Sequence, residues 1–139
     1  MDKQVRRVID ANFNRVREGL RVCEEFARFF FNDRAVTRDI KKIRNILGRI
    51  YQSPALKKDL IIRSRDTMND VGRKGFAFEK DRNKLSDVFW ANIQRSKEAL
   101  RVLEEFSKLS DKKLSDKFKE LRFKTYEIEK KAFNRLRNL

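Results

Sequence analysis

Residues 11–26, ANFNRVREGLRVCEEF, are followed 80 residues later by a close copy, ANIQRSKEALRVLEEF, at residues 91–106. Ten of the sixteen aligned positions are identical. Helix propensity alone does not select which Asn, Arg and Glu recur, because several polar residues form helices about equally well. The copy therefore indicates a duplicated unit whose repeated polar residues share a role.

The apolar residues around the first copy recur every three or four positions, as on one buried face of a helix. They predict a helix over about 2–31 and a second helix after the capping candidates Asn32 and Asp33. Ser53-Pro54 ends this second helix and precedes a short third helix over about 55–62. The expected core positions are Ile9, Phe13, Val16, Leu20, Cys23, Ala27, Phe30, Val36, Ile40, Ile43, Leu47 and Ile50.

The second half follows the same plan. A long helix is expected over about 84–109, and Ser110-Asp111 can cap the helix after it. TRDIKKIR (37–44) aligns with SDKFKELR (115–122), which matches Arg44 to Arg122. The core positions expected here are Phe89, Ile93, Leu100, Leu103, Leu114, Phe118, Leu121, Thr125, Ile128, Ala132 and Leu136. The predicted fold class is all-α: a helical hairpin, present twice about a pseudo-twofold axis, forms an antiparallel helix bundle.

Between the hairpins, SRDTMNDVGRKGFAFEKDRN (64–83) breaks the helical period and holds two of the four glycines. It is predicted to be an irregular insert. No βαβ alternation appears. We expect one domain over 1–139, with repeat one at about 5–52 and repeat two at about 84–139.

The chain carries 36 basic and 21 acidic residues, a formal charge of +15. Such a charge attracts nucleic acid, anionic lipid or phosphorylated small molecules without choosing among them. No run approaches the roughly 20 apolar residues that a bilayer span requires. No signal-peptide pattern opens the chain. We therefore expect no membrane partner.

The single cysteine, Cys23, excludes an internal disulfide and fits a reducing cytoplasm, where we expect the protein to be located. Its place in the apolar stripe favours a core role over a nucleophilic one. The chain has no His. It therefore lacks the usual proton shuttle and the commonest zinc ligand.

Most of the repeated residues lie on one flank of the predicted helix, beside its apolar face. With about 100° per residue, seven of the ten identities fall on this flank. They are Ala11, Asn12, Arg15, Glu18, Val22, Glu25 and Phe26, matched by Ala91, Asn92, Arg95, Glu98, Val102, Glu105 and Phe106. Two interpretations stay open. The flanks can pack on each other about the pseudo-twofold axis, with Ala11 and Gly19, matched by Ala91 and Ala99, permitting close approach, and with Arg–Glu ion pairs at i, i+3. The flanks can also line a pocket, and the two interpretations can be true at the same time.

The insert offers a second group of polar residues, RSRDTMNDVGR (63–73), in which arginines surround acidic and amide side chains. Magnesium is typically held by one or two carboxylates together with substrate phosphates, and the arginine fork suits phosphate. The alternative is an ordinary charged turn with local hydrogen bonds. No GxxxxGK[ST], GxGxxG, CxxC or HExxH pattern occurs, so any ATP chemistry must use another kind of site.

Three ordered stretches, IDANFNRVREGLRVCEEFARF, SRDTMNDVG and ANIQRSKEALRVLEEFSKL, resemble a small bacterial family of thiamin biosynthesis. This is the monofunctional hydroxymethylpyrimidine phosphate kinase family, whose members occur alone or fused to the N-terminus of thiamin-phosphate synthase. The resemblance implies ATP-dependent phosphorylation of 4-amino-2-methyl-5-hydroxymethylpyrimidine monophosphate to its diphosphate. The synthase itself is a TIM barrel, which needs about 200 residues or more and is absent here.

The resemblance and the residue types together suggest roles. Asp66 and Asp70 would hold Mg²⁺, while Arg65 and Thr67 would contact transferring phosphates. The phosphates and the pyrimidine would be held by residues of the two repeats, with glutamates orienting the arginines. These residues are Asn12, Arg15, Glu18, Asn92, Arg95, Glu98, Arg44 and Arg122. Whether the site closes only in a homodimer stays open.

Two other functions compete with the kinase. The charge suggests a basic RNA-binding protein, although its 21 acidic residues are interspersed and no docking motif is evident. A non-catalytic helical domain associated with thiamin-phosphate synthase would explain the fusion without ATP turnover.

Overall fold

The computed structural model describes residues 1–139, and all of its regular elements are helical. This confirms the all-α class. The elements are α1 (Lys3–Glu25), the π-helix η1 (Phe26–Phe30), α2 (Arg34–Gln52), α3 (Lys58–Arg63), the 3₁₀-helix η2 (Ala77–Lys80), α4 (Leu85–Ser107) and α5 (Lys112–Leu136).

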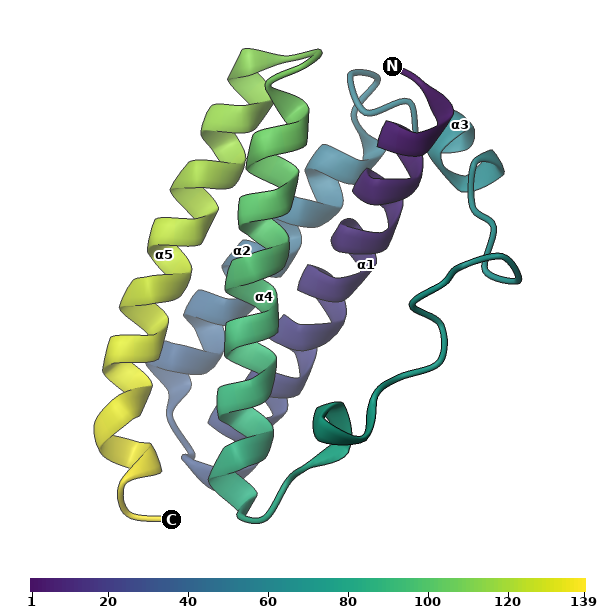
Figure 1. The fold of residues 1–139 in the computed structure, drawn as a ribbon. Helices are drawn as coiled ribbons and strands as arrows, with labels where there is room; N and C mark the ends of the chain where they lie inside the picture. The colour runs from purple at the N-terminus through teal and green to yellow at the C-terminus, as the bar shows by residue number, and fades with distance from the viewer.

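Four long helices form the bundle, and each helix runs antiparallel to the helices it touches (Figure 1). α1 packs against α4 in the most extensive contact, α2 lies on α1, and α5 lies on α4. α2 and α5 also meet. The two predicted hairpins, α1–α2 and α4–α5, are therefore joined through their first helices. None of the helices is long and apolar enough to cross a membrane.

Three of the four long helices have an aspartate as their N-cap residue. The side chains of Asp2, Asp33 and Asp111 accept hydrogen bonds from the backbone N–H groups three residues later, at 2.8, 3.0 and 3.1 Å. Each bond satisfies one of the donors that a helix start leaves unpaired. The predicted caps Asp33 and Asp111 are confirmed. The short third helix begins at Lys58, later than expected, because Lys57 adopts a left-handed conformation (φ 55°).

The core is one cluster of 26 buried apolar residues from both hairpins. Every predicted core position is buried except Phe30, which is 50% exposed. The π-turn explains this correction: the Phe31 N–H donates to the Phe26 carbonyl, five residues back, at 3.0 Å. The extra residue in the turn rotates Phe30 outward and places Phe26 and Phe31 inside.

The close approach of α1 and α4 depends on Gly19. A Cβ atom at this position would lie 2.4 Å from Ser96 Oγ and 2.9 Å from the Asn92 carbonyl oxygen. Ala99, the matching residue of the second repeat, is also buried. The packing interpretation of the repeated flank is therefore confirmed at this crossing.

The insert leaves the bundle after α3 and returns to the start of α4 along the outside of α1 (Figure 1). Residues 67–85 are all exposed. The prediction of an irregular insert is confirmed. Its first residues lie beside the N-terminal half of α1, and they form the site described next.

Candidate functional site

A groove of about 740 Å³ lies between the N-terminal half of α1 and the start of the insert. It brings together six of the predicted site residues from two distant parts of the chain. These are Asn12, Arg15, Arg65, Asp66, Thr67 and Asp70. The other lining residues are Gln4, Arg7, Val8, Asp10, Ala11, Asn14 and Val102.

Asp10 fixes the insert to α1 at the floor of this groove. Its two carboxylate oxygens accept hydrogen bonds from Arg65 Nε and Nη2, both at 2.7 Å. The Asp10 side chain is 6% exposed and the Arg65 side chain 42% exposed. These hydrogen bonds raise the pKa of the Arg65 guanidinium. The pair therefore holds one predicted phosphate ligand in a fixed place with its outer part reaching solvent.

A second attachment lies next to this pair. Ser64 is buried, accepts a hydrogen bond from Arg6 Nε at 2.8 Å and donates to the Leu60 carbonyl at 2.8 Å. Arg7 Nη2 also donates to the Asp66 carbonyl at 3.4 Å. The first residues of the insert are thus held by α1, whereas the rest of the insert is exposed.

The two predicted metal ligands have different local partners. Asn69 donates to both oxygens of the exposed Asp66 carboxylate, from its backbone N–H at 3.2 Å and its side chain at 2.9 Å. These bonds hold the pKa of Asp66 below its usual range, so the group is ionised at neutral pH. Asp70 accepts from the Gly72 N–H at 2.8 Å, as in a local turn.

The structure has no group of three or more carboxylates, thiols or imidazoles placed to enclose a metal ion. Of the three aspartates that line the groove, Asp10 is paired with Arg65, which leaves Asp66 and Asp70 for an ion. Two carboxylates in one groove with arginines still fit Mg²⁺ if phosphate oxygens complete its coordination, which is how proteins commonly bind this ion. The residues present therefore suit Mg²⁺ only when the ion binds together with a phosphate.

The matching residues of the second repeat lie mostly outside this groove. Of the repeated flank on α4, only Val102 reaches the groove. Trp90 stands where the first repeat has Asp10. Asn92, Arg95 and Glu98 therefore lie outside the groove, and their predicted contact with ligand stays a prediction.

The asparagines of the two repeats act alike inside the helices. Asn12 Nδ2 donates to the Val8 carbonyl at 2.8 Å, and Asn92 Nδ2 donates to the Val88 carbonyl at 2.7 Å. These contacts explain the repeated Asn without any ligand, although Asn12 also accepts a hydrogen bond from Arg15 Nη1 at 3.3 Å.

The expected ion pairs between Arg15 and Glu18 and between Arg95 and Glu98 are wrong. Arg15 contacts Asn12, and Glu98 accepts a hydrogen bond from Gln94 at 3.1 Å. Both arginines and both glutamates are exposed. Exposed pairs gain little energy, so little is lost when they do not form.

The repeated glutamates Glu24 and Glu104 form ion pairs that the sequence interpretation missed. Glu24 accepts from Arg44 at 2.8 Å, and Glu104 from Arg122 at 3.0 and 2.9 Å. Both glutamate side chains are at most 5% exposed. Arg44 and Arg122 were predicted to bind phosphate. In the structure each pairs with a buried glutamate, and each pair joins the two helices of one hairpin.

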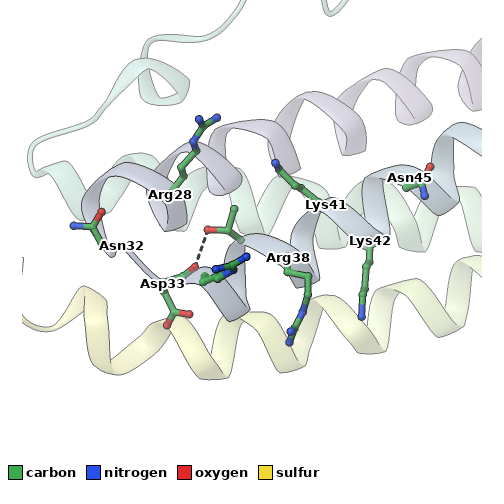
Figure 2. Close-up of a pocket in the computed structure, with 9 residues that line it drawn as sticks. Arg28, Asn32, Asp33, Arg38, Lys41, Lys42 and Asn45 are labelled. Carbon is green, nitrogen blue, oxygen red and sulfur yellow. Dashed lines mark hydrogen bonds between the residues drawn. The ribbon is translucent and has the colours of Figure 1, made fainter.

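A larger hollow of about 890 Å³ lies at the other end of α1, where the chain turns into α2. Figure 2 shows its lining, which has no hydrophobic residue. Its five cations are Arg28, Arg34, Arg38, Lys41 and Lys42. Its one acid, Asp33, caps α2 and pairs with Arg135 at 3.4 Å. The hollow contains none of the predicted site residues, and its charge suits any polyanion.

Comparison with known proteins gives one family. Residues 7–131 match the ThiD2 family. A protein named thiamine-phosphate synthase from Thermosynechococcus vestitus is 42% identical over 128 residues, covering 91% of this chain and 35% of that protein. Proteins of the same name from a Synechocystis strain (40% over 126 residues, 90% and 35%) and Rhodopirellula baltica (38% over 125 residues, 89% and 33%) are also similar.

The chain therefore spans about a third of the length of these relatives. No solved structure matches it.

Proposed function

The chain belongs to the ThiD2 family, and from that membership we propose that it acts in thiamine biosynthesis as an ATP-dependent kinase of a phosphorylated pyrimidine. The acceptor is 4-amino-2-methyl-5-hydroxymethylpyrimidine monophosphate, and the product is its diphosphate. The donor is ATP.

The observation that carries this proposal is the groove at the start of the insert. Arg7 and Arg15 from α1 and Arg65 from the insert line it together with the carboxylates of Asp66 and Asp70. Arginines suit phosphate oxygens because their planar fork offers several N–H donors and a permanent charge. Converging arginines and carboxylates in one groove are what the transfer of a phosphoryl group between two anions requires.

The proposed reaction suits a chain without His. The nucleophile is an oxygen of the substrate phosphate, which is already largely ionised at neutral pH because its second pKa is about 6. No general base has to remove a proton before the attack. What the residues must do is position two anions in line and offset their repulsion, and Arg15 and Arg65 are the side chains placed to do so.

Mg²⁺ would be held by Asp66 and Asp70 together with phosphate oxygens, and it would neutralise charge on the phosphates. Asn69 supports this role because its two hydrogen bonds orient the Asp66 carboxylate and favour its charged form. Thr67 also lines the groove, and its hydroxyl would donate a hydrogen bond to a phosphate.

A second candidate is favoured by the comparisons. The similar proteins are named thiamine-phosphate synthase, and this chain matches about a third of each. A helical domain that assists a synthase without turning over ATP would account for that name. Faster thiamine phosphate formation by a synthase mixed with this chain, with no ADP formed, would favour this candidate over the kinase.

The deciding experiment measures ADP release from Mg-ATP with three acceptors: the pyrimidine monophosphate, the free alcohol and none. We expect turnover with the monophosphate alone. The free alcohol lacks the phosphate group, which supplies the attacking oxygen and also pairs with the arginines. Arg15→Ala and Asp66→Ala should each remove turnover, with unfolding free energies within about 0.5 kcal/mol of the parent chain. Lys130→Ala, an exposed cation on α5, is the matched control. Full activity in both groove variants would reject the site.

A further inference from the structure

The two buried Glu–Arg pairs have different surroundings, although the sequence repeats them. In the second hairpin, Arg122 donates from Nε and Nη2 to Glu104 and from Nη1 to the Tyr126 hydroxyl at 2.8 Å. The Lys97 ammonium lies 5.6 Å from the centre of the Tyr126 ring. Tyr126 therefore covers the arginine and satisfies its outer face.

The first hairpin lacks this cover. The alignment that matches Arg44 to Arg122 matches Gly48 to Tyr126. A Cβ atom at Gly48 would meet nothing within 4 Å. Arg44 Nη1 donates to Glu24, but its Nε is buried and has no hydrogen-bond partner. An unsatisfied buried donor costs free energy, about 1–3 kcal/mol, unless something else accepts its hydrogen bond.

A hollow of about 390 Å³ lies at this uncovered arginine. It is lined by Asn14, Arg17, Glu18, Arg21 and Arg44. Its volume is in the range of small-ligand sites, about 300–1,000 Å³. Three cations face one carboxylate in the hollow, so a ligand with negative charge is favoured. Arg21 also pairs with Glu25 at 3.0 Å, and the Arg17 guanidinium lies 5.6 Å from the centre of the Tyr51 ring.

This hollow adjoins the groove at the start of the insert. Asn14 lines both. A molecule with a ring in the hollow can therefore extend a charged group toward the groove. The corresponding residues of the second hairpin are engaged with one another: Lys97 pairs with Glu129, and Gln94 donates to Glu98.

We propose that the hollow beside Arg44 is the ring site of the acceptor: a planar heteroaromatic ring lies over the Arg44 guanidinium, as Tyr126 lies over Arg122 in the second hairpin, and directs its phosphate toward the adjoining groove. The ligand class is a small aromatic phosphate. The choice of the pyrimidine monophosphate rests on the proposed function. The glycine itself supports the inference, because Gly inside a helix costs about 1 kcal/mol relative to Ala and is usually retained for a packing or functional reason.

The test introduces at Gly48 of the first hairpin the tyrosine that the second hairpin has at the matching position, Tyr126. Gly48→Tyr should place a ring over Arg44, as Tyr126 does over Arg122, without unfolding the chain, because a Cβ atom at Gly48 meets nothing within 4 Å. Ala35→Tyr adds the same ring to the same helix at an exposed residue that lines neither the hollow nor the groove, and it is the matched control. Binding of the pyrimidine monophosphate and of ATP is measured by calorimetry, and ADP release is measured in parallel.

We expect Gly48→Tyr to weaken binding of the pyrimidine monophosphate at least about 30-fold, equivalent to about 2 kcal/mol, and to leave ATP binding unchanged. Ala35→Tyr should bind both as the parent chain does. Unchanged monophosphate binding in folded Gly48→Tyr would overturn the ring site and leave the kinase standing. Loss of ATP binding alone would overturn it too, since the ring would then be that of the nucleotide.

The remaining outcomes separate the two proposals. Monophosphate binding that Gly48→Tyr abolishes, without any ADP release by the parent chain, would reject the kinase and keep the ring site. A parent chain that binds no pyrimidine monophosphate would reject the ring site as stated.

Discussion

Removing Arg65 should destabilise the protein more than removing its partner Asp10. Arg65→Ala takes both donors from a carboxylate that is 6% exposed. Asp10→Ala leaves a guanidinium that is 42% exposed and can turn to water. Hydrogen bonds to charged groups contribute about 1.5–3 kcal/mol, and solvent at the arginine screens part of this interaction. We therefore expect a loss of about 2 kcal/mol for Arg65→Ala and under about 1 kcal/mol for Asp10→Ala.

Urea unfolding followed by far-UV circular dichroism measures these losses, with the double variant closing the cycle. Asp10→Ala/Arg65→Ala no longer buries an unpaired carboxylate, so its loss should be smaller than the sum of the single losses by about 1–2 kcal/mol. Lys131→Ala, which breaks an exposed pair with Asp39 at 3.0 Å, is the control and should cost under about 1 kcal/mol. Single losses that add within about 0.5 kcal/mol would refute the anchoring role of this pair.

Four further results are expected. Gly19→Ala should lower the unfolding free energy by about 1–3 kcal/mol in urea titration, because its Cβ would lie 2.4 Å from Ser96 Oγ. Arg122→Ala should cost about 3–5 kcal/mol in the same assay, since it leaves the buried Glu104 carboxylate unpaired. Burial raises the pKa of the Cys23 thiol from 9.0 to about 12, so between these pH values the folded chain keeps a proton that the unfolded chain releases. The free energy of unfolding should therefore be unaffected by this group below about pH 8 and should fall from pH 9 toward 12. A thiol reagent at neutral pH should react with Cys23 only after the chain unfolds. Gel shifts with generic RNA should show only weak binding that disappears as salt is raised, and tight binding that survives physiological salt would revive the nucleic-acid function.

Helical periodicity predicted the bundle because the buried faces obey it over most of their length. The exception is instructive: Phe30 continues the spacing of three and four residues, yet one extra residue in the π-turn places Phe31 inside instead. A π-turn depends on packing between helices, so the pattern of apolar residues in one helix does not reveal it. The caps Asp33 and Asp111 were predictable because capping is local.

The site was predictable only in part, for a related reason. Comparison of the repeats found Asn12 and Arg15, and the composition of the insert found Arg65, Asp66, Thr67 and Asp70, all of which line the groove. Asp10 was missed because the second repeat has Trp90 in its place, so the comparison gave it no weight. Its partner Arg65 is 55 residues away in the chain. The one signal that could have found it is an acidic residue directly beside the apolar face, next to Ile9 in the sequence.

The joining of two like hairpins in one polypeptide has a consequence for how such a protein can evolve. In a homodimer of identical hairpins, every substitution appears twice, so a residue that opens one site opens both. In a single chain the copies mutate separately. Trp90 opposite Asp10 and Tyr126 opposite Gly48 are differences that only this arrangement permits. One copy can then specialise in structural support while its twin is free to acquire chemistry.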